Sequence, residues 1–319
     1  AVQEINNKSS DEKNEIVLMQ DITLGGNPNE YTLYTLSRGN TTIKGGGNKI
    51  TISNAGITVT GEKTTLNLGE KGYKGTLTID GKTSGGFITV SGRATANMYE
   101  NVTLQNGEFA GNACVVIMGS ESVFNMHGGV IEKCSRAVMA DSGTTFHMLG
   151  GKILNCVSGN DGGGIFLYKA TFIMDGGIIS GCEGLLGGGL YAEKSSTVNI
   201  NNGTISGCTA DNGGGLCAEE SSTVTISGGT ISGCKKVGAG GGLYAKNKST
   251  INITGGTISG CEGRWGGGLY AENSSTIEIT GGTISRCKVG AGGGLFVTDS
   301  TLNIEGGTIS ECSTTLDTG

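Results

Sequence analysis

The stretch "GGTISGCEGRWGGGLYAENSSTIEI" at residues 255–279 decides the fold, because near-copies of it precede and follow it along the chain. Two of these copies are "NGTISGCTADNGGGLCAEESSTVTI" at residues 202–226 and "GGTISGCKKVGAGGGLYAKNKSTINI" at residues 228–253. Such self-similarity is typical of a solenoid, in which each repeat buries a narrow strip of core against its neighbours. We therefore expect one structural unit, repeated many times.

A column of cysteines gives the period of the repeat. One cysteine follows each "TIS"-like segment, and successive members lie 22 to 27 residues apart: Cys134, Cys156, Cys182, Cys208, Cys234, Cys261, Cys287 and Cys312. The variation in length falls between the cysteine and the "GGG" run that follows it. We therefore expect that stretch to be a loop.

Each repeat contains three short segments with β character, which are "TIS", "GLYAE" and "STIEI" in residues 255–279. Gly pairs, the "GGG" run and Ser/Asn clusters separate them, and these are turn signals. No segment has the 3.6-residue apolar period of a helix. The pattern predicts an all-β chain that forms a right-handed single-stranded parallel β-helix, with three short strands per coil of about 26 residues.

The regularity of the repeat changes along the chain. Residues 111–319 hold the regular repeats, whereas residues 1–110 hold less regular strand-and-turn segments such as "TTIKGGGNKITIS". We expect residues 1–110 to form irregular N-terminal coils and a cap, continuous with the regular coils in one domain. No polar capping repeat follows the final "TISEC", so we also expect the natural chain to continue beyond Gly319.

Alternation within the strands assigns their side chains to two faces. In one repeat we expect the inward residues to be Ile205, Leu216, Ala218, Val224 and Ile226. Each has an identical or similar counterpart in the other regular repeats. Like residues should therefore stack along the axis and form the core.

The second segment of the repeat carries an outward position that is aromatic in most copies. Its members are Phe166, Tyr191, Tyr244, Tyr270 and Phe296, with Cys217 in the same slot. Two interpretations stay open: the rings bind a ligand such as a sugar or a protein partner, or they only stabilise adjacent coils. Trp265, the only tryptophan, lies beside Arg264 in the variable stretch and is a further candidate contact residue.

The fragment "ISGCTADNGGGLCA" at residues 205–218 resembles the repeats of chlamydial polymorphic membrane proteins. That family carries a GG-[AILV] element and an F-x-x-N element. The first element matches at residues 163–165, 188–190, 214–216, 241–243, 267–269 and 293–295, while the second reads I-x-x-C here, as from Ile205 to Cys208. The resemblance implies a pectin-lyase-like fold and an adhesin or spacer role in a secreted or cell-surface protein of a bacterium.

Three interpretations of the cysteine column remain open. Buried thiols can act as small apolar side chains where the chain turns. Disulfides between neighbouring coils are possible, because stacked Cα atoms fall in the accepted range of about 4.4–6.8 Å. Metal binding is the third, although the column lacks the His partners and CxxC pairs of a zinc site. We favour reduced thiols.

No catalytic centre can be identified from the sequence, and we lean towards a protein that is not an enzyme. Glu193 and Glu219 would be neighbours on stacked coils, at a separation that suits a glycosidase pair. Repetition of an acid in the same slot is more typical of duplication than of a unique site. The two histidines, His127 and His147, occupy different slots, and no cofactor or metal ligand set stands out.

The charge and hydropathy of the chain limit its partners. The net charge is −6 and no basic block occurs, so we expect no nucleic acid partner. No apolar run approaches the roughly 18 residues that span a bilayer, so we expect no membrane insertion in this segment. We expect a monomer that binds a host glycan or protein, with a carbohydrate-active enzyme or carbohydrate-binding module on the same fold as the alternative.

Overall fold

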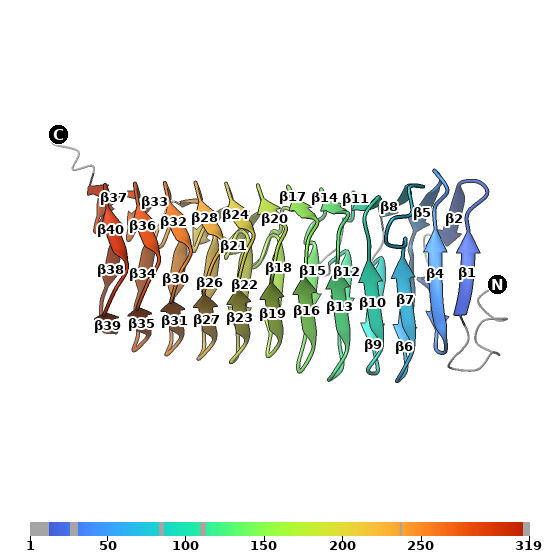
Figure 1. Ribbon diagram of the computed structural model, residues 1–319, viewed down its shortest axis with the longest axis horizontal. Helices are drawn as coiled ribbons and strands as arrows, with labels where there is room; N and C mark the ends of the chain where they lie inside the picture. The colour runs from blue at the N-terminus through green and yellow to red at the C-terminus, as the bar shows by residue number, and fades with distance from the viewer. Residues whose placement is uncertain (1–12, 26–30, 83–85, 109–112, 237, 315–319) are drawn as a thin grey trace. The chain divides into compact units, whose positions relative to one another are not determined.

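The computed structural model describes residues 13–25, 31–82, 86–108, 113–236 and 238–314. Within these ranges every regular element is a β-strand and none is a helix. The chain divides into two compact units, residues 1–153 and 154–319, and strand β17 (Lys152–Leu154) contains the division. In each unit the strands of successive coils lie side by side in parallel (Figure 1). The predicted all-β parallel β-helix is confirmed, whereas the predicted change of regularity near residue 110 stays a prediction.

Unit 1 has three parallel sheets, to which its coils add one strand each. The first sheet contains β1 (Lys13–Val17), β4 (Asn40–Lys44), β7 (Thr65–Leu68), β10 (Thr95–Met98), β13 (Val123–Met126) and β16 (Thr145–Met148). The second contains β2 (Ile22–Gly25), β5 (Lys49–Ser53), β8 (Leu77–Lys82), β11 (Val102–Gln105) and β14 (Val130–Glu132). The third contains β3 (Thr32–Leu36), β6 (Ala55–Thr60), β9 (Ile88–Ser91), β12 (Val115–Ile117) and β15 (Val138–Ala140).

Unit 2 repeats the three sheets. The first contains β19 (Thr171–Met174), β23 (Thr197–Ile200), β27 (Thr223–Ile226), β31 (Thr250–Ile253), β35 (Thr276–Ile279) and β39 (Thr301–Ile304). The second contains β20 (Ile178–Ser180), β24 (Thr204–Ser206), β28 (Thr230–Ser232), β32 (Thr257–Ser259), β36 (Thr283–Ser285) and β40 (Thr308–Ser310). The third contains β18 (Ile165–Tyr168), β22 (Leu190–Glu193), β26 (Leu216–Ala218), β30 (Leu243–Ala245), β34 (Leu269–Ala271) and β38 (Leu295–Val297).

Unit 2 also has a fourth sheet, formed by the stretch between the cysteine and the "GGG" run. It contains β21 (Glu183–Leu186), β25 (Thr209–Asn212), β29 (Lys235–Lys236), β33 (Glu262–Trp265), β37 (Lys288–Ala291) and β41 (Ser313–Thr314). The prediction that this stretch is a loop was wrong. Each copy lies beside its equivalent and satisfies its backbone groups there, as the amide of Thr209 does on the carbonyl of Cys182 at 2.9 Å.

Identical residues of successive coils pair in register, as the sequence predicts. Ile205 pairs with Ile231, and Leu216 pairs with Leu243. These side chains and the other predicted inward residues of the same repeat are buried. In unit 1 the same stacking places the rings of Phe124 and Phe146 with their centroids 5.3 Å apart. The predicted core columns are confirmed except at their last members, because Leu302, Ile304 and Ile309 are exposed.

The third glycine of the "GGG" run fits between two coils. A Cβ at Gly215 would lie 2.6 Å from the carbonyl oxygen of Gly242, 2.9 Å from Cγ2 of Ile231 and 3.2 Å from Sγ of Cys234. The same contacts recur at Gly242 with Ile258 and Cys261. The repeat therefore needs glycine here because the isoleucine and cysteine of the next coil fill the space.

We expect Gly215→Ala to lower the free energy of unfolding by about 1–3 kcal/mol, the usual range for an overpacked core. Urea denaturation followed by circular dichroism measures the change. Gly159→Ala is the matched control, because a Cβ at Gly159 meets nothing within 4 Å. Equal unfolding midpoints for both variants would contradict the assigned role of Gly215.

Candidate functional site

The outward aromatic residues of unit 2 form a continuous ladder on the third sheet. Phe166, Tyr191, Cys217, Tyr244, Tyr270 and Phe296 pair in that order. The rings of Tyr244 and Tyr270 are stacked with centroids 5.5 Å apart, and Tyr270 stacks on Phe296 at the same distance. The predicted ladder therefore exists.

The ladder is not a free surface, because the fourth sheet lies over it. Tyr191 and Tyr244 are only 3% exposed and Cys217 is fully buried, while Leu186 of β21 and Ala239 pack against them. The outward face of the third sheet thus becomes a second apolar layer. Ligand binding by Phe166, Tyr191, Tyr244, Tyr270 and Phe296 stays a prediction, and at the buried rings it would require the fourth sheet to move.

Tyrosine hydroxyls and glutamates form a polar edge to this layer. The Tyr191 hydroxyl lies 3.2 Å from Oε2 of Glu193 and 3.3 Å from Oε2 of Glu219. Tyr244 and Tyr270 both donate hydrogen bonds to Glu272, at 2.6 and 3.0 Å. Glu193 and Glu219 are therefore as close as a glycosidase pair, but each is a member of a hydrogen-bonded ladder that recurs at Glu272.

Burial is the main cause of the raised pKa values of Glu193 and Glu219, and it also raises the pKa of Tyr270 to about 12. A carboxyl whose pKa is raised on folding stabilises the fold less as the pH rises from the ordinary value of about 4.3 through the raised value. At neutral pH the carboxylate at Glu219 therefore opposes folding.

We expect Glu219→Gln to raise the melting temperature at pH 7. The gain should disappear below about pH 4, where the glutamate is protonated in both the folded and the unfolded chain. Thermal melts of the two proteins from pH 3.5 to pH 7.5 measure this, with the exposed Glu278→Gln as control. A variant that melts lower than the parent at pH 7 would show that the carboxylate stabilises the fold.

Trp265 lies on β33 of the fourth sheet, not in a loop. Its side chain is 37% exposed, and the Arg264 guanidinium lies 4.7 Å from the ring centroid. Cation–π contacts of this kind hold an exposed ring in place. Its role in ligand binding stays a prediction.

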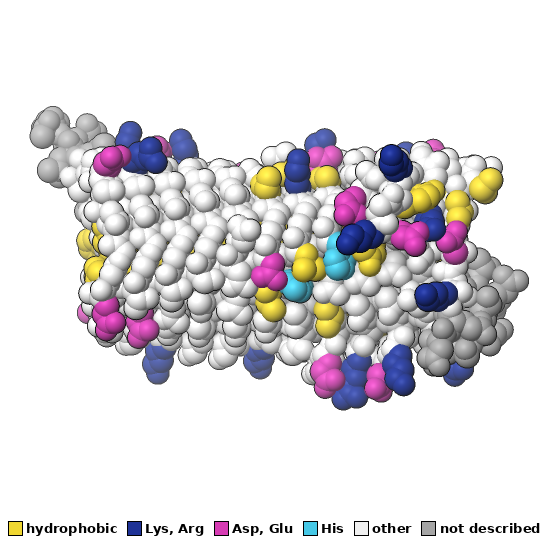
Figure 2. Space-filling model, viewed as in Figure 1, with side chains coloured by type: hydrophobic (Ala, Val, Ile, Leu, Met, Phe, Trp, Pro, Cys, Tyr) yellow, Lys and Arg dark blue, Asp and Glu magenta, His cyan; other side chains and the backbone are white. Residues whose placement is uncertain are grey.

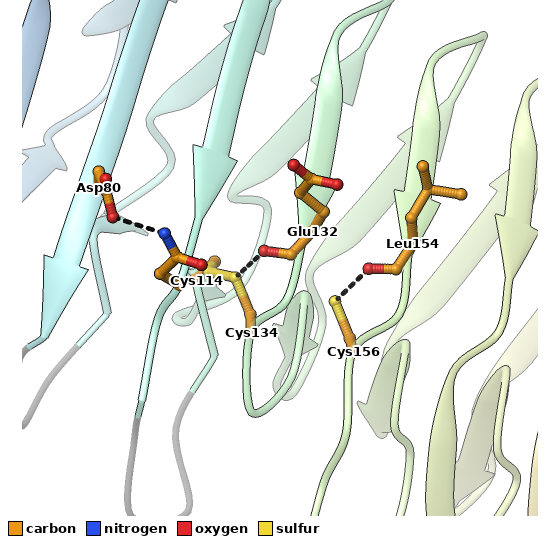
Figure 3. The surroundings of a disulfide bond; sticks show 7 residues. Asp80, Cys114, Glu132, Cys134, Leu154 and Cys156 are labelled. Carbon is orange, nitrogen blue, oxygen red and sulfur yellow. Dashed lines mark hydrogen bonds between the residues drawn. A yellow bond between two sulfur atoms is a disulfide. The ribbon is translucent and has the colours of Figure 1, made fainter.

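The cysteine column is buried and mostly reduced, with one exception. Cys156, Cys182, Cys208, Cys234, Cys261 and Cys287 are buried free thiols, and Cys312 is a half-buried one. The thiol of Cys182 donates to the backbone carbonyl of Ser180 at 3.6 Å, and that of Cys208 does the same to Ser206 at 3.5 Å. Cys134 is instead bonded to Cys114, with Cα atoms 6.5 Å apart (Figure 3). The prediction of a fully reduced column was wrong at Cys134.

The position of Cys114 explains this disulfide. Cys114 directly precedes β12, as the third glycine of the "GGG" run precedes each third-sheet strand of unit 2. That glycine lies against the cysteine sulfur of the next coil, as at Gly189 and Cys208. A cysteine in the glycine slot therefore meets the column cysteine of the following coil. The sequence contains this signal, although Cys114 lies outside the column of cysteines that follow the "TIS"-like segments.

We expect eight reactive thiols per chain after denaturation without reductant, and ten after reduction. Ellman titration in guanidinium counts them. Ten thiols before reduction would refute the disulfide between Cys114 and Cys134. Fewer than eight would indicate further disulfides among the remaining cysteines.

A polar groove of about 450 Å³ lies over the first sheet of unit 1, and the sequence analysis missed it. Its floor is formed by outward side chains of β4, β7 and β10: Asn67 and Asn97 are in register, while Thr42 occupies the matching position of β4 and Asn40 lies two residues before it. Asn67 donates to Oδ1 of Asn40 at 2.7 Å, Asn97 to Asn67 at 2.8 Å, and Asn125 of β13 to Asn97 at 2.9 Å. The signal was the asparagine of "TLNL", "TANM" and "VFNM", which recurs at unequal spacing.

A second column of residues directly follows these strands. It consists of Gly69 after β7, Tyr99 after β10 and His127 after β13. The rings of Tyr99 and His127 are parallel to within 5° with centroids 4.8 Å apart. Burial lowers the pKa of His127, so it is neutral at pH 7. Figure 2 shows the two histidines of the chain, in cyan, among acidic, basic and apolar side chains.

Charged side chains flank the groove. Lys44 is bonded to Glu15 at 2.7 Å and to Glu70 at 2.6 Å. The hydrogen bonds to Glu15 and then Glu70 raise the pKa of Lys44. Over the coils of unit 2, by contrast, the face in Figure 2 shows mostly uncharged atoms, with charged side chains along its two edges. The groove of unit 1 combines an aromatic ring with mixed charges, whereas a groove along the fourth sheet of unit 2 has Glu183, Asp211 and Lys235 in its lining but no aromatic residue among the described ones.

Two further kinds of site are absent from the described part of the chain. It contains no group of three or more His, Cys, Asp or Glu side chains placed to hold a metal ion. It also contains no helix of the length and hydropathy needed to cross a membrane.

Comparison with known proteins supports the fold and leaves the function open. The family model described as "Right handed beta helix region" matches residues 178–317, which is less than half of the chain. No curated protein and no solved structure matches it. The chain thus has a right-handed parallel β-helix fold, and the resemblance to chlamydial repeats stays a prediction.

Proposed function

We propose that the chain is a non-enzymatic glycan-binding module of a secreted or cell-surface protein, acting as a monomer. The observation that carries the proposal is the groove of unit 1, where the amides of Asn67 and Asn97 lie beside the ring of Tyr99. Sugars present many hydroxyls and an apolar ring face. Amides that donate and accept hydrogen bonds, together with an aromatic ring, match both features.

The disulfide supports an extracellular location. Disulfides persist in oxidising compartments and are rare in the cytosol. Cys114 and Cys134 form one, while the column of free thiols is shielded by burial in unit 2. A chain exported to the cell surface is consistent with both states of cysteine.

The alternative is a carbohydrate-active enzyme on the same fold. In the groove Glu15 and Glu70 are both paired with Lys44. A glycosidase needs two carboxyl groups that act on the substrate, and here one lysine holds both of them. Binding without cleavage is therefore the function that this geometry supports best.

We expect the chain to bind at least one polysaccharide on an array of plant and host glycans, and to release no reducing ends from it. Asn67→Ala with Asn97→Ala should weaken binding about tenfold or more, because two hydrogen bonds to the sugar are lost. Asn199→Ala, at the equivalent outward position of β23 in unit 2, is the matched control.

Release of products from any polymer would refute the binding module and support the carbohydrate-active enzyme. Binding only to proteins on a parallel protein array would show that the ligand is a protein and not a glycan. Equal loss of binding in the control and in the groove variant would show that the binding site does not lie in the groove of unit 1.

A further inference from the structure

We infer that the groove of unit 1 holds a subsite for one neutral pyranose ring, seated over Gly69 against the face of Tyr99. The inference rests on the proposed function and names its ligand class and the residues that select it. It starts from the second outward column, in which Gly69, Tyr99 and His127 occupy equivalent positions on three successive coils.

Backbone hydrogen bonds fix these three residues one coil apart. The amide of Gly69 donates to the carbonyl of Ile43, that of Tyr99 to Leu68, and that of His127 to Met98. Rings in such a column lie one above the other, as Tyr99 and His127 do. One face of Tyr99 is therefore covered by His127, and the other is directed towards the coil of Gly69.

Glycine leaves that second face open. Gly69 has a φ of +71°, and an added Cβ would point towards the coil of Tyr99, at 2.8 Å from Cγ2 of Val102 and 3.7 Å from Cβ of Tyr99. Any larger side chain at this position would project along the column and cover the ring. Gly69 and Tyr99 both line the groove, which confirms that the space between them is open to solvent. A flat ring of the size of a sugar is the ligand that such a gap accepts.

The neighbouring amides can bind the hydroxyls of that ring. Among the described residues Asn97 donates one of its two N–H groups, to Asn67. Its second N–H and the remaining lone pairs of both amide oxygens are available to a ligand. The groove thus offers a donor and acceptors beside the ring face of Tyr99.

The charges of the groove favour a neutral sugar. The carboxylates of Glu15 and Glu70 and the ammonium groups of Lys13 and Lys71 line it, so the lining carries no excess of either charge. Lys44 pairs with both carboxylates, and an uncharged sugar needs no ionic partner in such a groove. A volume of about 450 Å³ lies within the usual range of small-ligand sites and suits a short segment of a glycan.

The test is calorimetric titration of the whole chain with cellohexaose, mannohexaose and xylohexaose, and with hexagalacturonate as the acidic comparison. We expect at least one neutral hexamer to bind. Tyr99→Ala should weaken that binding at least about tenfold, and Tyr99→Phe should stay within about twofold, because the ring face is retained. Tyr168→Ala, at a half-buried tyrosine of unit 2, is the matched control.

Gly69→Asn tests the gap itself. Asparagine tolerates a positive φ, and its side chain would enter the space over Tyr99. We expect it to abolish binding and to lower the urea midpoint, because its Cβ would lie 2.8 Å from Cγ2 of buried Val102. If this variant unfolds, the Tyr99→Ala and Tyr99→Phe pair still decides the question.

Each remaining outcome overturns the inference. Binding of hexagalacturonate alone would refute the neutral class. Binding of a neutral hexamer that both Tyr99→Ala and Gly69→Asn leave unchanged would refute the subsite, while the glycan-binding module would stand. Failure of every hexamer to bind, with a polysaccharide bound on the array, would also refute the subsite alone. If no polysaccharide on the array binds either, both the subsite and the glycan-binding module are refuted.

Discussion

Backbone hydrogen bonding between equivalent residues of successive coils is the constraint on which the structure depends. The amide of Leu216 donates to Gly242 and that of Leu243 to Gly268, both at 2.9 Å, and the pattern continues through the "GGG" runs. Side chains at equivalent positions are then forced into contact at the strand spacing of about 4.7–4.9 Å. A residue is therefore acceptable only where it packs on its own counterpart, which explains why isoleucine, leucine, cysteine and tyrosine each form a column.

The same constraint gives unit 2 two apolar layers. Inside the coil, the first three sheets enclose the isoleucine and leucine columns. Outside the third sheet, the tyrosine ladder would be left in water if the stretch after the cysteine were a loop. That stretch pairs with its own copies to form the fourth sheet and covers the rings, while the hydroxyls of Tyr191 and Tyr244 reach glutamates at the edge. A repeated loop thus becomes a strand because its neighbours supply the missing partners.

Most of the fold of unit 2 could be predicted because its signals are periodic. The alternation around Ile205 and Leu216 and the glycine turns were sufficient for strands, faces and core. The fourth strand could not be predicted, because "TADN" and "EGRW" have no common apolar pattern. Their pairing rests on backbone hydrogen bonds and on side-chain contacts that differ between copies, such as Lys235 with Glu262. The exposure of Tyr191 depended on that strand and was wrong for the same reason. In unit 1 the coils differ in length, so the alignment of Asn67 with Asn97 becomes visible only once the register is known.

In a solenoid, a specific binding site forms most readily where a column of like side chains is interrupted. A site made of identical residues in every coil would bind in any register, so it cannot position one ligand. Cys217 interrupts the tyrosine ladder, but it lies under the fourth sheet and opens nothing. Gly69 interrupts the Tyr99–His127 column at the groove of unit 1, beside amides that bond to one another and so hold fixed orientations. Preorganised polar groups lose little entropy when a ligand binds. The least regular part of the chain is therefore the part in which the fold supports a specific site.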